Sequence, residues 1–250
     1  MRLEEFAERL RTCPNVVFFT GAGISTESGV PDFRSPGGIW SRYQPVYFDE
    51  FLSSHQARVR QWQMKKEIHE LYKNVKPNIG HYAIRDFEKR GQLLGLITQN
   101  IDGLHSFSGV SDDKVVELHG TDRFVKCLEC EKRFEPEPIY EMLIGDFKPP
   151  TCDACGGWLK PATISFGQAM PTEPMRRAQE LSESAEVFIV VGTSLQVQPA
   201  ASFPVLAKRG GALLAIINRD ETPLDDIADF KHRGAIGEFF TKLNPLLSDG

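Results

Sequence analysis

Four of the five cysteines form two Cys-x-x-Cys pairs, a spacing that is typical of a metal site. The pairs are Cys127 with Cys130 and Cys152 with Cys155, and residues 131–151 separate them. Two pairs supply four thiolates, which complete a tetrahedral shell around zinc and leave no open position for water or substrate. The sequence therefore predicts one structural Zn²⁺, with free cysteines as the alternative. Cys13 is expected to be a buried, small apolar residue.

A glycine-rich turn follows the first apolar run of the chain. Val16–Phe19 is apolar throughout, and Gly21, Ala22 and Gly23 come shortly after it. Glycines allow a backbone to approach a phosphate closely, and the amide N–H groups of such a turn point at the anion. Thr26 stands where a third glycine would complete the usual dinucleotide-binding pattern. An ordinary strand-to-helix turn therefore remains the alternative.

Asp32, Phe33 and Arg34 lie just beyond this turn. An arginine can bind a phosphate through two parallel hydrogen bonds, and a phenylalanine can shield a reactive centre from water. A surface ion pair is the ordinary interpretation of Arg34. Following the glycine turn, the segment favours a nucleotide site.

Polar side chains also follow three later apolar runs, 93–98, 186–191 and 213–217. Amide and hydroxyl groups can bind a ribose or a carboxamide without adding charge, and a carboxylate can accept from a hydroxyl. Taken singly, each group is better explained as an Asx turn or a helix N-cap. The residues are Gln99, Asn100, Asp102, Gly192, Thr193, Ser194, Asn218, Arg219 and Asp220.

His119 is the candidate general base. It follows the expected short strand 115–118 and precedes Gly120, where other groups can approach its ring. Histidine is the side chain best suited to take a proton near neutral pH, although most histidines in proteins are structural. No comparable context surrounds the other five, which are His55, His69, His81, His105 and His232.

The elements that must position these groups alternate between strands and helices. Strands are expected at 16–19, 93–98, 115–118, 186–191 and 213–217, and helices at 3–11, 58–73, 78–91, 200–209 and 237–243. This alternation predicts an α/β fold with a Rossmann-like parallel sheet and helices on both faces. Ligands of such sheets gather at the carboxyl ends of the strands, where every polar group named above lies. Residues 126–160 are expected to form an inserted, metal-stapled lobe.

Composition limits the class of protein. The chain has 250 residues, a net charge of −5, 41% hydrophobic and 25% charged residues, and a pI near 5.7. These values favour one globular domain with a small inserted lobe and argue against a general nucleic-acid binder. The N-terminus has no secretory signal, and the uncharged run 187–207 is too polar to span a bilayer. We therefore expect a cytoplasmic protein without membrane or sequence-specific nucleic-acid partners.

Together these segments resemble the sirtuin family of NAD-dependent protein deacylases. The matching segments occur in family order and span nearly the whole chain. They are Gly21–Arg34 (GAGISTESGVPDFR), Thr98–Asp102 (TQNID), Leu118–Gly120 (LHG), the two cysteine pairs, Phe166-Gly167, and Gly192–Leu195 (GTSL).

The resemblance implies one catalytic domain over residues 1–250, in two parts. A large Rossmann-like domain would comprise about 1–35, 78–120 and 161–250. A small inserted domain would comprise a helical module at about 36–77 and a zinc ribbon at about 121–160. NAD and an acyl-lysine protein or peptide would meet between the two parts.

The resemblance also implies roles for single residues. Asn100 and Asp102 would serve the nicotinamide side of NAD, and His119 would be the general base. The NAD-binding set would comprise Gly21, Ala22, Gly23, Thr26, Asp32, Phe33, Arg34, Trp40, Gln99, Asn100, Asp102, His119, Gly192, Thr193, Ser194, Asn218, Arg219, Asp220 and Ile236. The peptide would bind as an added strand between the segments that contain Phe166, Gly167 and Gln168 and that contain Leu195 and Val197.

The implied reaction consumes NAD. The acyl oxygen attacks the nicotinamide ribose, nicotinamide leaves, and His119 takes a proton through the ribose hydroxyls. Water then completes the release of free lysine and O-acyl-ADP-ribose. Protein ADP-ribosyl transfer and a non-enzymatic NAD-sensing module are the alternative functions.

Two positions depart from family patterns. Gln168 stands where many members carry glutamate, which alters the charge of the peptide site. Members that remove succinyl or malonyl groups carry Tyr-x-x-Arg, and the nearest match here is Trp62-Gln63-Met64-Lys65. An apolar acyl channel and a preference for acetyl or longer neutral acyl groups are therefore expected.

Overall fold

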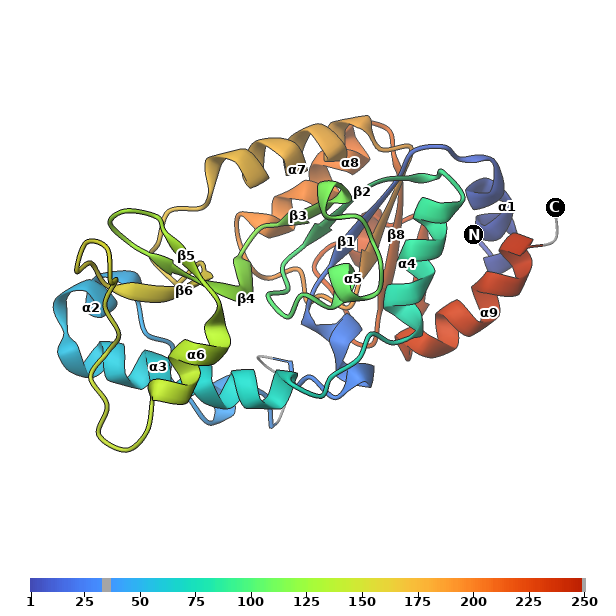
Figure 1. Ribbon diagram of the computed structural model, residues 1–250. Helices are drawn as coiled ribbons and strands as arrows, with labels where there is room; N and C mark the ends of the chain where they lie inside the picture. The colour runs from blue at the N-terminus through green and yellow to red at the C-terminus, as the bar shows by residue number, and fades with distance from the viewer. Residues whose placement is uncertain (33–36, 249–250) are drawn as a thin grey trace.

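The computed structural model describes residues 1–32 and 37–248 (Figure 1). Its main sheet has six parallel strands in the order β3-β2-β1-β7-β8-β9. These strands are β1 Val16–Thr20, β2 Leu93–Thr98, β3 Val115–Glu117, β7 Val187–Val191, β8 Leu213–Asn218 and β9 Phe230–Arg233. The predicted α/β fold is confirmed. The edge strand β9 has no counterpart among the expected strands, because its four residues include only one apolar side chain.

Helices cover both faces of this sheet. On one face lie α1 Leu3–Thr12, α4 Ile79–Lys89 and α9 Ile236–Ser248, and on the other lie α7 Thr172–Ser184 and α8 Phe203–Arg209 (Figure 1). Successive residues of β1 point to opposite faces, so Phe18 packs with the first group and Phe19 with the second. All five β1 residues are buried for this reason, which explains the unbroken apolar run in the sequence.

A smaller lobe lies beside the carboxyl ends of the strands (Figure 1). It contains α2 Phe48–Ser53, α3 His55–Tyr72, α6 Pro136–Met142 and a sheet in the order β5-β4-β6. Those strands are β4 Gly120–Cys127, β5 Arg133–Phe134 and β6 Leu159–Thr163. Trp62 of α3 packs against Val125 of β4 and Tyr140 of α6. Helix α3 and the later stretch of chain that contains β4 and α6 therefore share one core.

Several short elements complete the chain. They are helix α5 Leu104–Phe107 and the 3₁₀ helices Ala22–Ser28, Ile39–Ser41, Asp112–Lys114, Ala200–Ser202 and Asp225–Ile227. Each predicted helix is present with shifted ends. The sequence pattern does not predict α2, α5, α6 or α7, which are short or carry few apolar side chains. Within the described residues, no helix is long and apolar enough to cross a membrane.

Gly120, the first residue of β4, has no room for a side chain. This residue has a φ of +70°, and an added Cβ would lie 2.0 Å from the carbonyl oxygen of Ala162. The preceding residue, His119, accepts at its carbonyl oxygen from Ile164 N–H at 2.8 Å. The pairing of β4 with β6 begins at Gly120 itself. A side chain would therefore push the two connections between the parts away from each other.

We expect Gly120→Ala to destabilise the protein strongly. The cost should exceed the ~1–2 kcal/mol of a left-handed alanine, because a backbone clash adds to the strain. Gly211→Ala is the matched control, since Gly211 has a φ of +96° and no atom within 4 Å of an added Cβ. Urea unfolding of both variants measures the difference. Equal losses of unfolding free energy would contradict the assigned clash.

Candidate active site

A cavity of about 990 Å³ lies between the carboxyl ends of the sheet and the smaller lobe. We call it the cleft. Most of the predicted site residues line it, although they come from seven separate stretches of sequence. They are Gly21, Ala22, Gly23, Thr26, Asp32, Gln99, Asn100, His119, Phe166, Gly167, Gln168, Gly192, Thr193, Ser194, Val197, Asn218, Arg219, Asp220 and Ile236.

Some predicted residues are not part of the cleft wall as described. Phe33 and Arg34 lie outside the described residues, and so does the side chain of Trp40. Asp102 and Leu195 lie behind the wall. Leu195 packs in the core with residues of α8, and its contact with the peptide through the backbone stays a prediction.

The glycine turn is in direct backbone contact with the turn after β7. Gly23 N–H donates to Gly192 O at 2.8 Å, and Gly21 N–H donates to Val191 O at 3.1 Å. Gly192 has a φ of +63°, and its added Cβ would lie 2.3 Å from Ile24 N. The glycines are therefore required by the packing of the two turns. The same packing places the backbone of both turns at the wall of the cleft.

His119 is held with one ring nitrogen bonded to backbone. Its Nδ1 lies 3.0 Å from Gln99 O, and a carbonyl oxygen can only accept, so Nδ1 carries the proton. In the neutral ring the lone pair is then on Nε2, which is the arrangement a general base needs. The Gln99 side chain in turn donates to Thr193 Oγ1 at 3.0 Å, which ties this segment to the end of β7.

Ser25 connects the two other candidate catalytic residues. Its Oγ donates to Asp102 Oδ2 at 2.8 Å and accepts from Asn100 Nδ2 at 3.2 Å. Burial is the largest influence on Asp102 and raises its pKa, while bonds from Leu104 N–H and Ser25 oppose the rise. Asp102 is therefore connected to the cleft through Ser25 and Asn100, the latter being at the wall itself.

Two histidines, His81 and His105, lie behind this group, although their sequence context did not single them out. His81 Nδ1 accepts from Asn78 N–H at 3.3 Å, so its Nε2–H is directed to Ser25 Oγ at 3.4 Å. His105 Nε2 lies 2.9 Å from Thr20 Oγ1, and the two rings are 4.9 Å apart. Burial lowers the pKa of His81 to about 4 and lowers that of His105 as well, so both are neutral at pH 7.

Sequence reasoning missed these two histidines because their neighbours come from elsewhere in the chain. The available signals were weak. Asn78 begins a helix three residues before His81, and His105 follows Asp102 by three residues.

The acyl-channel comparison with Trp62 and Lys65 also needs correction. Trp62 faces the core of the smaller lobe, away from the cleft. The residues of α3 that line the cleft are Gln61, Met64, Lys65 and Ile68. Lys65 Nζ donates to both carboxylate oxygens of Asp122, at 2.9 and 2.8 Å, and both side chains are nearly buried.

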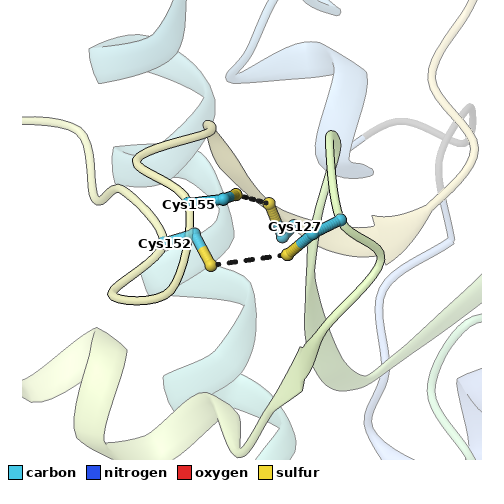
Figure 2. Close-up of side chains that lie close together, drawn as sticks. Cys127, Cys152 and Cys155 are labelled. Atoms are coloured by element: carbon cyan, nitrogen blue, oxygen red, sulfur yellow. Dashed lines mark hydrogen bonds between the residues drawn. The ribbon is translucent and has the colours of Figure 1, made fainter.

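The four paired cysteines converge in the smaller lobe, and Figure 2 labels three of them. Cys127 Sγ lies 3.5 Å from Cys155 Sγ, Cys130 Sγ lies 3.7 Å from Cys152 Sγ, and all four sulfurs lie within 4.8 Å of one another. A disulfide would need about 2.05 Å, whereas tetrahedral zinc with bonds of about 2.3 Å places its sulfurs roughly 3.8 Å apart. The residues fit a structural zinc ion, as predicted.

Replacing Cys152 with Ser should abolish zinc binding and lower the melting temperature by about 5–10 °C, because the metal holds two loops of the smaller lobe together. Cys13→Ala is the control, since Cys13 lies in the core of the larger part. Elemental analysis should find one zinc per chain in the parent and in the control. A fully stable, zinc-free parent protein would contradict a structural role for the metal.

Comparison with known proteins agrees with this geometry. A model of the Sir2 family matches residues 21–199. An NAD-dependent protein deacetylase of Rhodopseudomonas palustris is 47% identical over 236 residues, which cover 94% of this chain and 93% of the relative. An NAD-dependent protein deacetylase of Thermotoga maritima is 39% identical over 240 residues, covering 96% of each chain.

Solved structures agree as well. One described as "Sir2-p53 peptide-NAD+" has a TM-score of 0.87 and 38% identity, and covers 98% of each chain. Another, from "The Structural basis of Sirtuin Substrate Affinity", has a TM-score of 0.88 and 36% identity, and covers 100% of each chain. The match extends over the sheet, the glycine turns and the cysteine-bearing lobe alike, and the chain belongs to the Sir2 family, the sirtuins.

Proposed function

We propose that this protein is an NAD-dependent protein-lysine deacylase that transfers neutral acyl groups to ADP-ribose. The observation that carries the proposal is the placement of His119. Its ring is fixed by Gln99 O in the tautomer of a base, and it lines the same cleft as the glycine turns and the α3 face. The relatives with nearly full-length matches are named deacetylases or deacylases.

The residues at the cleft fit NAD, which supplies the ADP-ribose that accepts the acyl group. Backbone N–H groups of the glycine turn suit the phosphates, and Gln99, Thr193 and Asn218 offer neutral hydrogen-bonding groups to the riboses. Asn100, backed by Ser25 and Asp102, offers an amide to the carboxamide. His119 removes a proton from a ribose hydroxyl.

The acyl-lysine peptide enters between two segments that line the cleft. These are Phe166–Gln168 on one side and Ser194–Val197 on the other. An extended peptide binds such edges by backbone hydrogen bonds, with little dependence on its sequence. Gln168 Oε1 accepts from Ser165 N–H at 3.0 Å, so this side chain closes its own turn.

The α3 face favours neutral acyl groups. Lys65 carries the only full positive charge among the four α3 residues that line the cleft, and Asp122 binds it through both carboxylate oxygens. An acyl carboxylate approaching Lys65 would meet Asp122 as well. Repulsion by this buried charge offsets the attraction, so a succinyl group gains nothing there.

The paired thiols and zinc fit a reducing compartment, and a cytoplasmic location belongs to the same proposal.

His119→Ala should lower turnover at least about 100-fold, because a positioned base contributes that much or more. Binding of NAD should remain close to that of the parent, since other residues hold the dinucleotide. Mass spectrometry of the products and calorimetric titration with NAD measure the two effects. Retained turnover would remove His119 from the mechanism, and a modified acceptor protein in place of O-acyl-ADP-ribose would favour ADP-ribosyl transfer.

Asp122→Asn should raise the succinyl-to-acetyl ratio of kcat/KM about tenfold, because the freed ammonium of Lys65 gains a charge-assisted partner in the acyl carboxylate. The parent should prefer acetyl-lysine. The double variant with Lys65→Met is the control, and it should lose the gain. An unchanged ratio in a folded Asp122→Asn protein would contradict the neutralising role of Asp122.

A further inference from the structure

A second cavity, of about 350 Å³, is lined by residues of strands β3, β4 and β6 and of helix α7. We call it the second cavity. Thr163, Ile164 and Gln168 line both this cavity and the cleft, so these residues form a wall between the two. Apart from Gln168, the residues that line the second cavity have no part in the proposed function. The second cavity is therefore a separate place where a ligand could bind.

Apolar side chains form much of the lining of the second cavity. Strand β3 contributes Val115 and Val116, strand β4 contributes Phe124, and the first turn of α7 contributes Pro174. Cavities that hold small organic ligands have volumes of about 300–1,000 Å³ and combine an apolar wall with a few polar groups. The second cavity is at the lower end of this range, so a small ligand with an apolar body fits it best.

Lys160 is a buried basic residue in this lining. It is 1% exposed, and its Nζ donates to the carbonyl oxygens of Pro161 and Thr163. Among the residues that the structure describes, no carboxylate forms an ion pair with it. An ammonium has three donors, so one remains for a ligand. Burial lowers the pKa of Lys160 to about 7, to which Lys65 contributes and which Asp122 opposes, as is usual for a buried cation without a counter-charge.

Arg177 of α7 is a second cation in the lining with an uncharged partner. Its Nη2 donates to the backbone oxygen of Asp113, and within the described ranges no carboxylate pairs with it. Lys126, the third basic residue of the lining, forms an ion pair with Glu131 at 2.8 Å. Two of these three cations are therefore bonded only to neutral oxygens.

The acidic residues of the lining are already paired with arginines that do not line the cavity. Glu117 lies 3.6 Å from Arg123 Nη2, and Glu173 lies 2.6 Å from Arg176 Nη2. Neither acid is thus placed to neutralise Lys160 or Arg177. The second cavity combines an apolar wall with an excess of positive charge.

We propose that the second cavity binds a small monocarboxylate with an apolar body, through the ammonium of Lys160. The carboxylate accepts the remaining donor of Lys160 in a charge-assisted hydrogen bond and supplies the missing counter-charge, and Arg177 adds to the attraction. A neutral apolar molecule would leave Lys160 without a counter-charge. An inorganic phosphate would leave the apolar wall uncovered.

A pair of ligands that differ in charge tests the proposal. The dissociation constants of cyclohexanecarboxylate and of cyclohexylmethanol are measured by ligand-observed NMR titration of the full chain at pH 7. The two molecules have the same ring, so their comparison reports the carboxylate. The carboxylate should bind at least about tenfold more tightly. An excess of acetyl-lysine peptide, added without NAD, should not displace it. Equal affinities, or displacement by the peptide, would overturn the proposal.

Lys160→Met should weaken binding of cyclohexanecarboxylate at least about tenfold, because it removes the ammonium and keeps a side chain of similar length. Arg177→Gln, a change at a partly exposed position, should weaken binding about threefold. Arg176→Gln is the matched control, since this neighbouring arginine does not line the second cavity, and it should leave the affinity within about twofold. Unchanged affinity in a folded Lys160→Met protein would overturn the proposal. If that variant does not fold, unchanged affinity in Arg177→Gln does so.

Discussion

The close contact between the turns after β1 and β7 is the constraint on which the rest of the site depends. Gly23 donates to Gly192 across this contact, and neither position has room for a Cβ. The contact brings the carboxyl ends of two neighbouring parallel strands together without intervening side chains. Backbone amides and carbonyls therefore form that part of the cleft surface, and a dinucleotide can lie along it without displacing side chains.

Behind this surface, buried hydrogen bonds hold the candidate catalytic side chains in place. Ser25 joins Asn100 to Asp102, and His81 and His105 support the group as neutral rings because burial lowers the pKa of both. Breaking a hydrogen bond of this buried network leaves a polar atom unpaired in a medium that penalises it, so the network resists rotation of its members. Rigidity at this place suits a reaction whose weak nucleophile must be held near its target.

In the proposed function, the smaller lobe supplies the wall of the cleft that contacts the acyl group. The four-cysteine cluster and the core around Trp62 fix α3 against β4, and α3 then presents Gln61 and the bound Lys65 to the cleft. Charge neutralisation by Asp122 belongs to this lobe as well, because Asp122 lies on β4. In the proposed function, acyl selectivity and dinucleotide binding are carried by different parts of the chain.

The sequence by itself determined the α/β class, the polar strand ends and the four-cysteine cluster, because each depends on local spacing or on an unbroken apolar run. Edge strand β9 and helix α7 could not be predicted from the sequence. They have few apolar residues, and packing against neighbouring elements determines their secondary structure. Only the tertiary structure decided that His81 and His105 support the site and that Gln61, not Trp62, faces the cleft. Those assignments depend on which side of a helix meets which strand. Successive side chains of α3 are separated by about 100° around the helix axis, so a shift of one residue would bring a different set of side chains to the cleft.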